Sequence, residues 1–184
     1  MKNSRVRTLV HGCGVALVLL SVPARANDCT LSLSQSQIEL GVLRPGALSI
    51  APGQPELFLG RRRLSLNIAC PRPTTMALRF EAPAAGSQAF RFDRQGRFTV
   101  SLSNALLDGK PVTLGAAPYL VEATENRLIA PGQSLQVLAR DLPAKGRFFS
   151  AQVEIDTHLP VSATRVRDET PVEGRGRFEL LSGG

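Results

Sequence analysis

Apolar and polar residues alternate with a period of two along most of the chain beyond residue 28. In a β-strand, successive side chains point to opposite faces, so this period is typical of half-buried strands. No stretch keeps the i, i+3, i+4, i+7 spacing for the ten or more residues that a helix needs. The pattern therefore predicts about seven to nine short strands, separated by Gly- and Pro-rich turns, and an all-β sandwich.

The first strands follow from their apolar positions. The expected segments are Cys29–Leu33, a continuation through Ile38 and Leu40 on the opposite parity, Leu64–Cys70, and Met76–Phe80. The change of parity predicts a bulge or a change of sheet within Gln35–Gln37. Because proline cannot donate to a strand ladder, Pro71-Arg72-Pro73 is expected to break the chain between two strands.

The later strands follow the same rule. The expected elements are a hairpin of Phe90–Phe92 and Phe98–Leu102 across the Asp93–Gly96 turn, a strand through Val112 and Leu114 after Asp108-Gly109, a strand through Leu135 and Val137, a loop at Asp141–Gly146, a strand Phe149–Ile155, and a last strand through Phe178 and Leu180. No repeat or low-complexity linker divides these segments, so one domain is expected.

An export signal precedes the strands. Basic residues come first, residues 13–22 form a short apolar run, and Ala24-Arg25-Ala26 has the small-x-small form of a cleavage site. The apolar run is about half the length that a membrane span needs. We therefore expect residues 1–26 to be a signal peptide, residues 27–184 to be one exported domain, and no membrane insertion.

Removal of the signal changes the charge. The full chain has 22 Lys and Arg against 15 Asp and Glu, and four of the basic residues lie within the signal, so the net charge falls from +7 to +3. A balance this weak argues against a nucleic-acid partner. The basic run Arg61–Arg63 is interpreted as a solvated strand entry, and contact with an anionic surface is the alternative.

Two cysteines, Cys29 and Cys70, remain after the signal is removed. In an oxidising exported compartment, a disulfide between them is expected. In the chain-entropy model such a bridge stabilises the fold by about 4 kcal/mol. Two cysteines without a nearby histidine supply too few ligands for a metal site.

The residues do not form a catalytic set. His158 is the sole histidine of the mature chain, and no Gly-x-Ser-x-Gly motif supplies a nucleophile for it. Two carboxylate pairs, Glu122 with Glu125 and Asp168 with Glu169, are interpreted as solvated loop charges. No phosphate-binding glycine loop is present. We therefore expect no enzyme activity, no cofactor and no metal.

The order of these motifs resembles that of chaperone–usher fimbrial subunits. A cysteine opens an alternating segment, Ile38-Glu39-Leu40-Gly41 follows, and the next strand ends at a second cysteine, Cys70. The resemblance is greatest to single-domain pilin-like proteins of fimbrial operons, and it extends over most of residues 29–181. Its later parts are Phe90-Arg91-Phe92, Leu107-Asp108-Gly109 and the segments Arg167–Thr170 and Phe178–Leu180.

The resemblance implies an immunoglobulin-like sandwich that lacks its last strand. A periplasmic chaperone lends a strand to such a subunit, and a neighbouring subunit later replaces it, which is a form of β-augmentation. Phe178 and Leu180 would then border the open groove and contact the chaperone or donor strand. Ordinary core packing of a final strand is the alternative for both residues, and the sequence leaves open whether residues 159–181 supply the missing strand internally.

Two departures from the family pattern bear on the role of the subunit. The chain lacks the penultimate aromatic residue of pilins, and only Asn27 and Asp28 lie between the predicted cleavage site and Cys29. Two residues are too short to fill a groove in a neighbouring subunit. We therefore expect a fimbrial subunit that accepts a strand without donating one, at the tip or as an accessory component, with a chaperone, an outer-membrane usher and other subunits as partners. The alternative is a self-complete exported β-sandwich that binds carbohydrate or protein.

Overall fold

The computed structural model describes residues 29–35, 55–117, 127–164 and 174–183. Within these ranges the chain is almost entirely antiparallel β-strand, with one short 3-10 segment, η2 (Val161–Thr164). The strands are β1 (Thr30–Leu33), β2 (Glu56–Glu81), β3 (Phe90–Phe92), β4 (Gly96–Leu107), β5 (Lys110–Pro111), β6 (Thr113–Ala117), β7 (Arg127–Ile129), β8 (Ser134–Ala139), β9 (Leu142–Pro143), β10 (Lys145–Pro160) and β11 (Arg177–Gly183).

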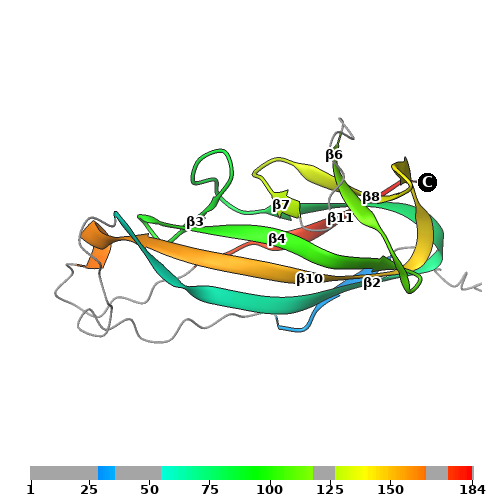
Figure 1. Ribbon diagram of the computed structural model, residues 1–184, viewed down its shortest axis with the longest axis horizontal. Coiled ribbons are helices and arrows are strands. Elements are labelled where there is room, and N and C mark those ends of the chain that lie inside the picture. The colour runs from blue at the N-terminus through cyan, green and yellow to red at the C-terminus, as the bar shows by residue number, and fades with distance from the viewer. Residues whose placement is uncertain (1–28, 36–54, 118–126, 165–173, 184) are drawn as a thin grey trace, which may run out of the picture.

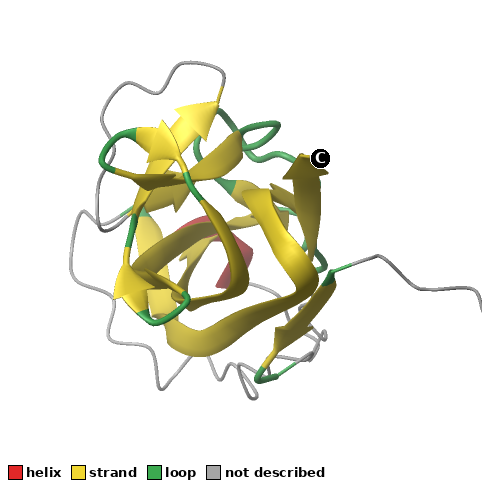
Figure 2. Cartoon of the chain, turned by 90° about the vertical axis from the view of Figure 1, so that its right-hand side faces the viewer, coloured by secondary structure: helices red, strands yellow, loops and turns green. Residues whose placement is uncertain are grey.

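The long strand β2 organises the fold because it takes part in two layers. Its first half pairs with β1 and β10, and β10 in turn pairs with β4. Its second half pairs with β11 and β8, and β8 pairs with β6. Figure 1 shows β2 turning back on itself at one end of the molecule, and Figure 2, seen along the strands, shows the sheet curled around its interior. The result is a curled antiparallel sandwich.

The predicted break at Pro71-Arg72-Pro73 is wrong. β2 runs through it as one strand of 26 residues. The ladder to β10 skips these positions, passing from the pair Gly146–Thr74 to the pair Phe148–Ala69. Since proline has no N–H to donate, the segment leaves the ladder where the strand passes from one layer to the other. The prolines therefore mark a bend instead of an end.

The Arg61–Arg63 run lies inside β2 and does not precede it. Arg61 and Arg63 lie opposite carboxylates of β10: Arg61 Nη2 is 2.6 Å from Asp156 Oδ2, and Arg63 Nε is 2.8 Å from Glu154 Oε2. Alternation turns Arg62 toward the other face. The strand continues through three arginines because cross-strand ion pairs on its outer face accommodate two of them.

Most of the predicted strands are confirmed. The hairpin of β3 and β4 closes where Phe92 pairs with Gly96, and Asp93 has the positive φ of 52° that such a tight turn requires. The segment predicted as a loop at Asp141–Gly146 is partly strand, because it contains β9 and the first residues of β10. The predicted strand through Ile38 and Leu40 lies outside the described residues.

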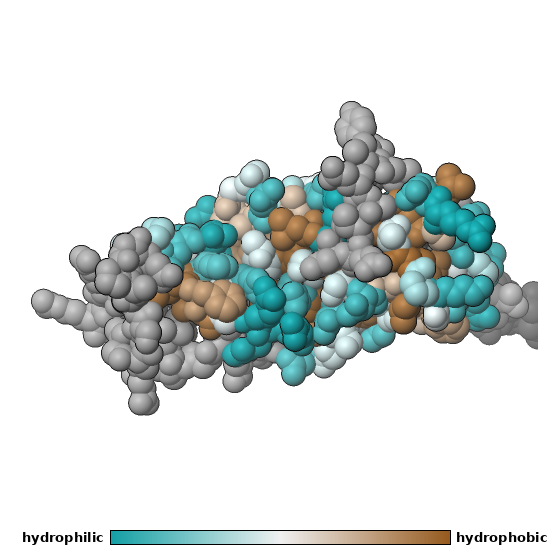
Figure 3. All heavy atoms as spheres, in the orientation of Figure 1, coloured by the Kyte–Doolittle hydropathy of each residue, from teal (hydrophilic) through white to brown (hydrophobic). Residues whose placement is uncertain are grey.

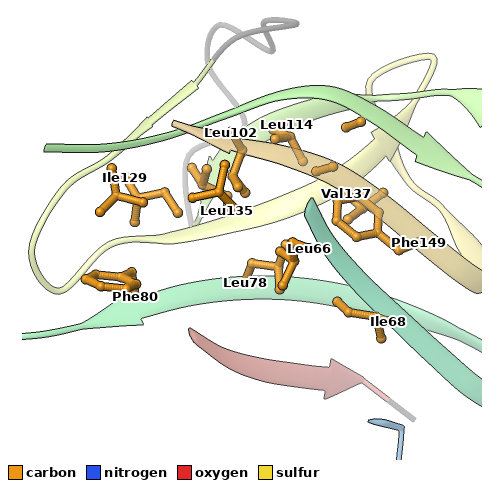
Figure 4. Packing of buried hydrophobic residues seen from close by; sticks show 14 of the residues in the cluster. Leu66, Ile68, Leu78, Phe80, Leu102, Leu114, Ile129, Leu135, Val137 and Phe149 are labelled. Carbon is orange, nitrogen blue, oxygen red and sulfur yellow. The ribbon is translucent and has the colours of Figure 1, made fainter. Parts of the chain in front are cut away.

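The core lies between the two layers. Its largest fully buried side chains come from β2, β3, β4, β6, β7, β8 and β10. Figure 4 shows how labelled core residues of β2, β4, β6, β7, β8 and β10 pack together. Phe80 contacts Phe90, Phe98 and Phe178, with ring centroids 4.9, 5.9 and 5.0 Å apart. Among the described residues, every buried side-chain nitrogen or oxygen has a hydrogen-bond partner. The predicted all-β sandwich is therefore confirmed, and its disulfide joins Cys29 to Cys70 with an S–S distance of 2.06 Å.

Candidate functional site

The strands β1 and β11 lie along one edge of β2. At Ala69, β2 has β10 on one side and β1 on the other, and at Thr75 it has β10 on one side and β11 on the other. A strand has only two hydrogen-bonding edges, and the ladder to β10 follows β2 throughout, with irregularities at the bend and between Thr157 and His158. β1 and β11 therefore share the edge opposite β10, one in each layer of the sandwich. Both run antiparallel to β2, so the end of β11 points toward the start of β1.

The disulfide ties the start of β1 to this edge. β1 covers β2 from Leu66 to Ala69, and β11 covers it from Thr75 to Glu81. Cys70 follows directly after the first of these segments, and its bond to Cys29 fixes the chain at the point where the edge passes from one layer to the other. The sequence prediction for the two cysteines thus places a covalent link at the meeting point of β1 and β11.

The outer edges of β1 and β11 are open in the described part of the chain. Within those ranges β1 pairs only with β2, and β11 pairs only with β2. In each strand, alternate backbone N–H and C=O groups therefore face away from the sheet. Such an edge can accept another extended segment by backbone hydrogen bonding.

Apolar side chains at this edge are incompletely covered. Phe178 and Leu180 of β11 and Leu31 and Leu33 of β1 pack against the core, yet all four are half-buried. By contrast, the core-facing residues of the inner strands, such as Leu78, are fully buried. The hydrophobic core is therefore less completely covered along these two edge strands than along the inner strands. We call these four residues, with the two strands that carry them, the open edge.

The predicted contact residues Phe178 and Leu180 lie at this edge, on β11. Phe178 pairs with Phe80 of β2 and Leu180 pairs with Leu78, so each lies on the same face of the sheet as its partner. Their packing on the core and their incomplete burial are both features of the structure. Sequence reasoning did not single out Leu31 and Leu33 as residues of the same edge, although it had found the alternation of apolar residues after Cys29.

Ion pairs on the other face hold β11 in register. Arg79 Nη2 is 2.5 Å from Glu179 Oε2, and Arg177 Nη2 is 2.6 Å from Glu81 Oε2. Each pair joins residues directly opposite each other on β2 and β11. Hydrogen bonds from Arg79 lower the pKa of the Glu179 carboxyl, so both members stay charged near neutral pH. A slip by one residue would separate these charges and turn Phe178 away from the core.

Two glycines allow the chain to enter β11 across the aromatic cluster. A Cβ atom on Gly176 would overlap the ring of Phe80, and one on Gly174 would lie 3.0 Å from Cδ2 of Phe92. Only glycine fits so close to these rings without moving them. The start of β11 therefore lies directly against the core residues that Phe178 then joins.

A shallow hollow of about 680 Å³ lies beside this entry, between Arg79–Pro83 and Arg175–Arg177. Its charged walls contain the ion pairs of Arg79, Glu81 and Arg177 described above. Because these charges are already matched, the hollow is best explained as the outer surface of the β2–β11 pairing. Over β4, β10 and β2, hydrophilic and apolar side chains are mixed at the surface (Figure 3).

His158 lies beside an aromatic ring and a carboxylate that is already paired. Its ring lies 5.3 Å from the ring of Phe58, and neighbouring Glu56 accepts hydrogen bonds from Arg97 at 3.0 and 3.2 Å. Burial lowers the pKa of His158, and Arg97 lowers it further. The predicted carboxylate pairs at 122–125 and 168–169 lie outside the described residues. In the ranges that the structure covers, no three His, Cys, Asp or Glu residues gather as a metal site would require.

None of the helical segments within the described ranges is long and apolar enough to cross a membrane. No family model matches the chain, and its sequence matches no curated protein. Among solved structures, the chain is similar to the P pilus rod subunit PapA, with 12% sequence identity and a TM-score of 0.44, over 84% of this chain and 99% of that one.

Proposed function

We propose that this protein is an exported, non-catalytic subunit of a chaperone–usher fimbria, and that its open edge accepts a strand from another protein. The proposal rests on two features of β1 and β11: their outer backbone edges have no partner within the described residues, and they carry half-buried apolar side chains. An inserted strand would satisfy both at once, by adding ladder hydrogen bonds and by covering Phe178, Leu180, Leu31 and Leu33.

The other parts of the proposal come from the sequence. Residues 1–26 act as the export signal, and the mature chain passes through the periplasm to the cell surface. A periplasmic chaperone first occupies the open edge, and an outer-membrane usher then exchanges it for the strand of a neighbouring subunit. Since only Asn27 and Asp28 separate the cleavage motif from Cys29, the subunit receives a strand without giving one. That property suits the tip of the fibre or an accessory position.

The experiment starts from the complex of the mature chain with its periplasmic chaperone. A peptide copied from the donor arm of a shaft subunit of the same fimbria is added, and chaperone release is followed by size-exclusion chromatography. We expect the chaperone to leave and the Tm of the chain to rise, since a ligand that binds only the folded state stabilises it. No release together with an unchanged Tm would reject the accepting role.

Matched variants test the position of the site. Leu180→Asp places a charge among the apolar side chains of the open edge and should prevent the donor peptide from binding. Leu142→Asp makes the same change at a residue that is 69% exposed on β9 and should leave binding unchanged. If the mature chain expressed without a chaperone is a soluble monomer that does not bind the peptide, the fimbrial proposal is wrong. The protein is then a self-complete β-sandwich that binds carbohydrate or protein.

A further inference from the structure

Phe148 is an exposed aromatic side chain near the start of β10. It is 56% exposed, whereas its neighbour Phe149 is 2% exposed and belongs to the core. The ladder between β10 and β2 is irregular between Gly146 and Phe148. Such irregularities often re-aim a side chain near a functional site. Phe148 therefore points to the outer face of the sandwich, where burial gives no reason for a phenylalanine.

Asp108 fixes the backbone of Phe148. Its Oδ1 atom accepts hydrogen bonds from the backbone N–H of Arg147 at 3.0 Å and from that of Phe148 at 2.8 Å. The backbone N–H of Asp108 donates to the carbonyl oxygen of Phe148 at 2.7 Å. The guanidinium carbon of Arg147 lies 5.6 Å from the centre of the Phe148 ring. Three hydrogen bonds thus hold the backbone at Arg147 and Phe148, and a cation–π contact is made by the exposed ring itself.

A hollow of about 200 Å³ lies beside the ring. Two rows of cross-strand neighbours on β1, β2 and β10 line it. In the first row Ala69 lies between Thr30 and Phe148. In the second row Asn67 lies between Ser32 and Ser150. The short side chain of Ala69 leaves a depression between its two larger neighbours. The second row supplies a polar rim of two hydroxyl groups and an amide.

The polar side chains around the hollow have spare hydrogen-bonding capacity. The Thr30 and Ser32 hydroxyls make long bonds, of 3.3 and 3.5 Å, to carbonyl oxygens of β2. Asn67 is exposed to solvent, so its side-chain amide is accessible to a ligand. An amide supplies two donors and an acceptor, and each hydroxyl supplies a donor and acceptors.

We propose that this hollow binds a pyranose sugar, with Phe148 as its aromatic platform. A pyranose presents a patch of C–H groups that stacks on an aromatic ring, and hydroxyl groups at its rim that Asn67, Ser32 and Ser150 can bond. An apolar protein side chain would leave these rim groups without partners, which disfavours it. The volume is below the range of pockets for drug-sized ligands and suits a single ring. The hollow includes Thr30 and Ser32 of β1, which face away from Leu31 and Leu33 of the open edge. The proposal does not rest on the proposed fimbrial role.

The test is a titration of the ¹⁵N-labelled mature chain with glucose, galactose and N-acetylglucosamine, each to about 50 mM, followed by NMR. A ligand of about a dozen heavy atoms is expected to bind with a Kd on the order of millimolar. We expect saturable shifts for at least one sugar, confined to amides 30–32, 67–69, 109 and 148–150. Glycerol, which has hydroxyl groups but no ring face, should cause no saturable shift.

Two variants and a control separate the platform from the rest of the surface. Phe148→Ser should raise the Kd at least about tenfold, and Asn67→Ala should raise it about threefold. Phe58→Ser is the matched control, since Phe58 is 55% exposed elsewhere on the molecule, and its Kd should be unchanged. Absence of saturable shifts with all three sugars, or an unchanged Kd in both Phe148→Ser and Asn67→Ala, would overturn the proposal.

Discussion

The ring of Phe178 meets the ring of Phe80 edge-on, with centroids 5.0 Å apart and planes inclined at 67°. The two residues are also direct partners in the β2–β11 ladder. Phe80 is 6% exposed, whereas Phe178 is half-buried. The contact therefore joins the buried core to the open edge.

Phe80 is expected to be a main determinant of stability. Phe80→Ala removes contacts with three other phenylalanines and should lower the free energy of unfolding by about 3–5 kcal/mol in a urea titration. Phe58→Ala removes the same number of atoms from a ring that is 55% exposed and should cost less than about 1 kcal/mol. Equal losses in the two variants would show that the aromatic cluster does not stabilise the core.

The disulfide is expected to contribute a large share of stability. Cys29→Ser combined with Cys70→Ser should lower the free energy of unfolding by about 4 kcal/mol, because the unfolded chain then gains the freedom that the bridge removes. The wild-type chain measured after reduction should show the same loss. A loss below about 1 kcal/mol in both experiments would contradict this expectation.

Gly176 should not tolerate a side chain. In Gly176→Ala the new methyl group would overlap the ring of Phe80, so the variant should lose about 1–3 kcal/mol of stability as the chain or the ring moves. The Tm measured by circular dichroism should fall accordingly. Ser162→Ala, at an exposed position in η2, provides the matched small change and should leave the Tm close to that of the wild type. A Gly176→Ala variant as stable as the wild type would mean that this close approach is absent in solution.

The pKa of His158 should lie below the ordinary histidine value of about 6.5, because burial and Arg97 disfavour its charged form more than Glu56 and Asp156 favour it. A histidine whose folded pKa is lowered stabilises the fold above pH 6.5, and this stability is lost as the pH falls from there to the folded pKa. NMR titration of the imidazole measures the value directly. Phe58→Ala exposes the ring and should move its pKa toward 6.5, while a wild-type value at or above 6.5 would refute the interpretation.

Local patterns were sufficient to predict much of the fold. The alternation after Cys29, the hairpin around Asp93 and the Cys29–Cys70 bond all follow from residue types within a few positions or from the cysteine count. The single passage of β2 through Pro71 and Pro73 does not, because proline marks a break in local patterns and only the partner strands decide whether the strand resumes.

The site was only half predictable for a similar reason. The apolar alternation identified Phe178 and Leu180, but the position of β1 on the same edge of β2 depends on pairings between residues far apart in the sequence. Phe148 was missed because the predicted strand began at Phe149 and left Phe148 out. Successive side chains of a strand point to opposite faces of the sheet, so Phe148 and Phe149 cannot both face the core. This alternation would have indicated that one of the two rings is exposed.

The central claim is that the edge of β11 is open and can receive a strand. Amide hydrogen exchange tests it most directly, because the alternate amides of β11 that do not bond to β2 have no ladder partner within the described strands. We predict that these amides exchange rapidly in the isolated mature chain, while those of β10 are protected from both sides, and that a donor peptide slows their exchange at least about a hundredfold. Slow exchange of all β11 amides before any peptide is added would contradict the claim.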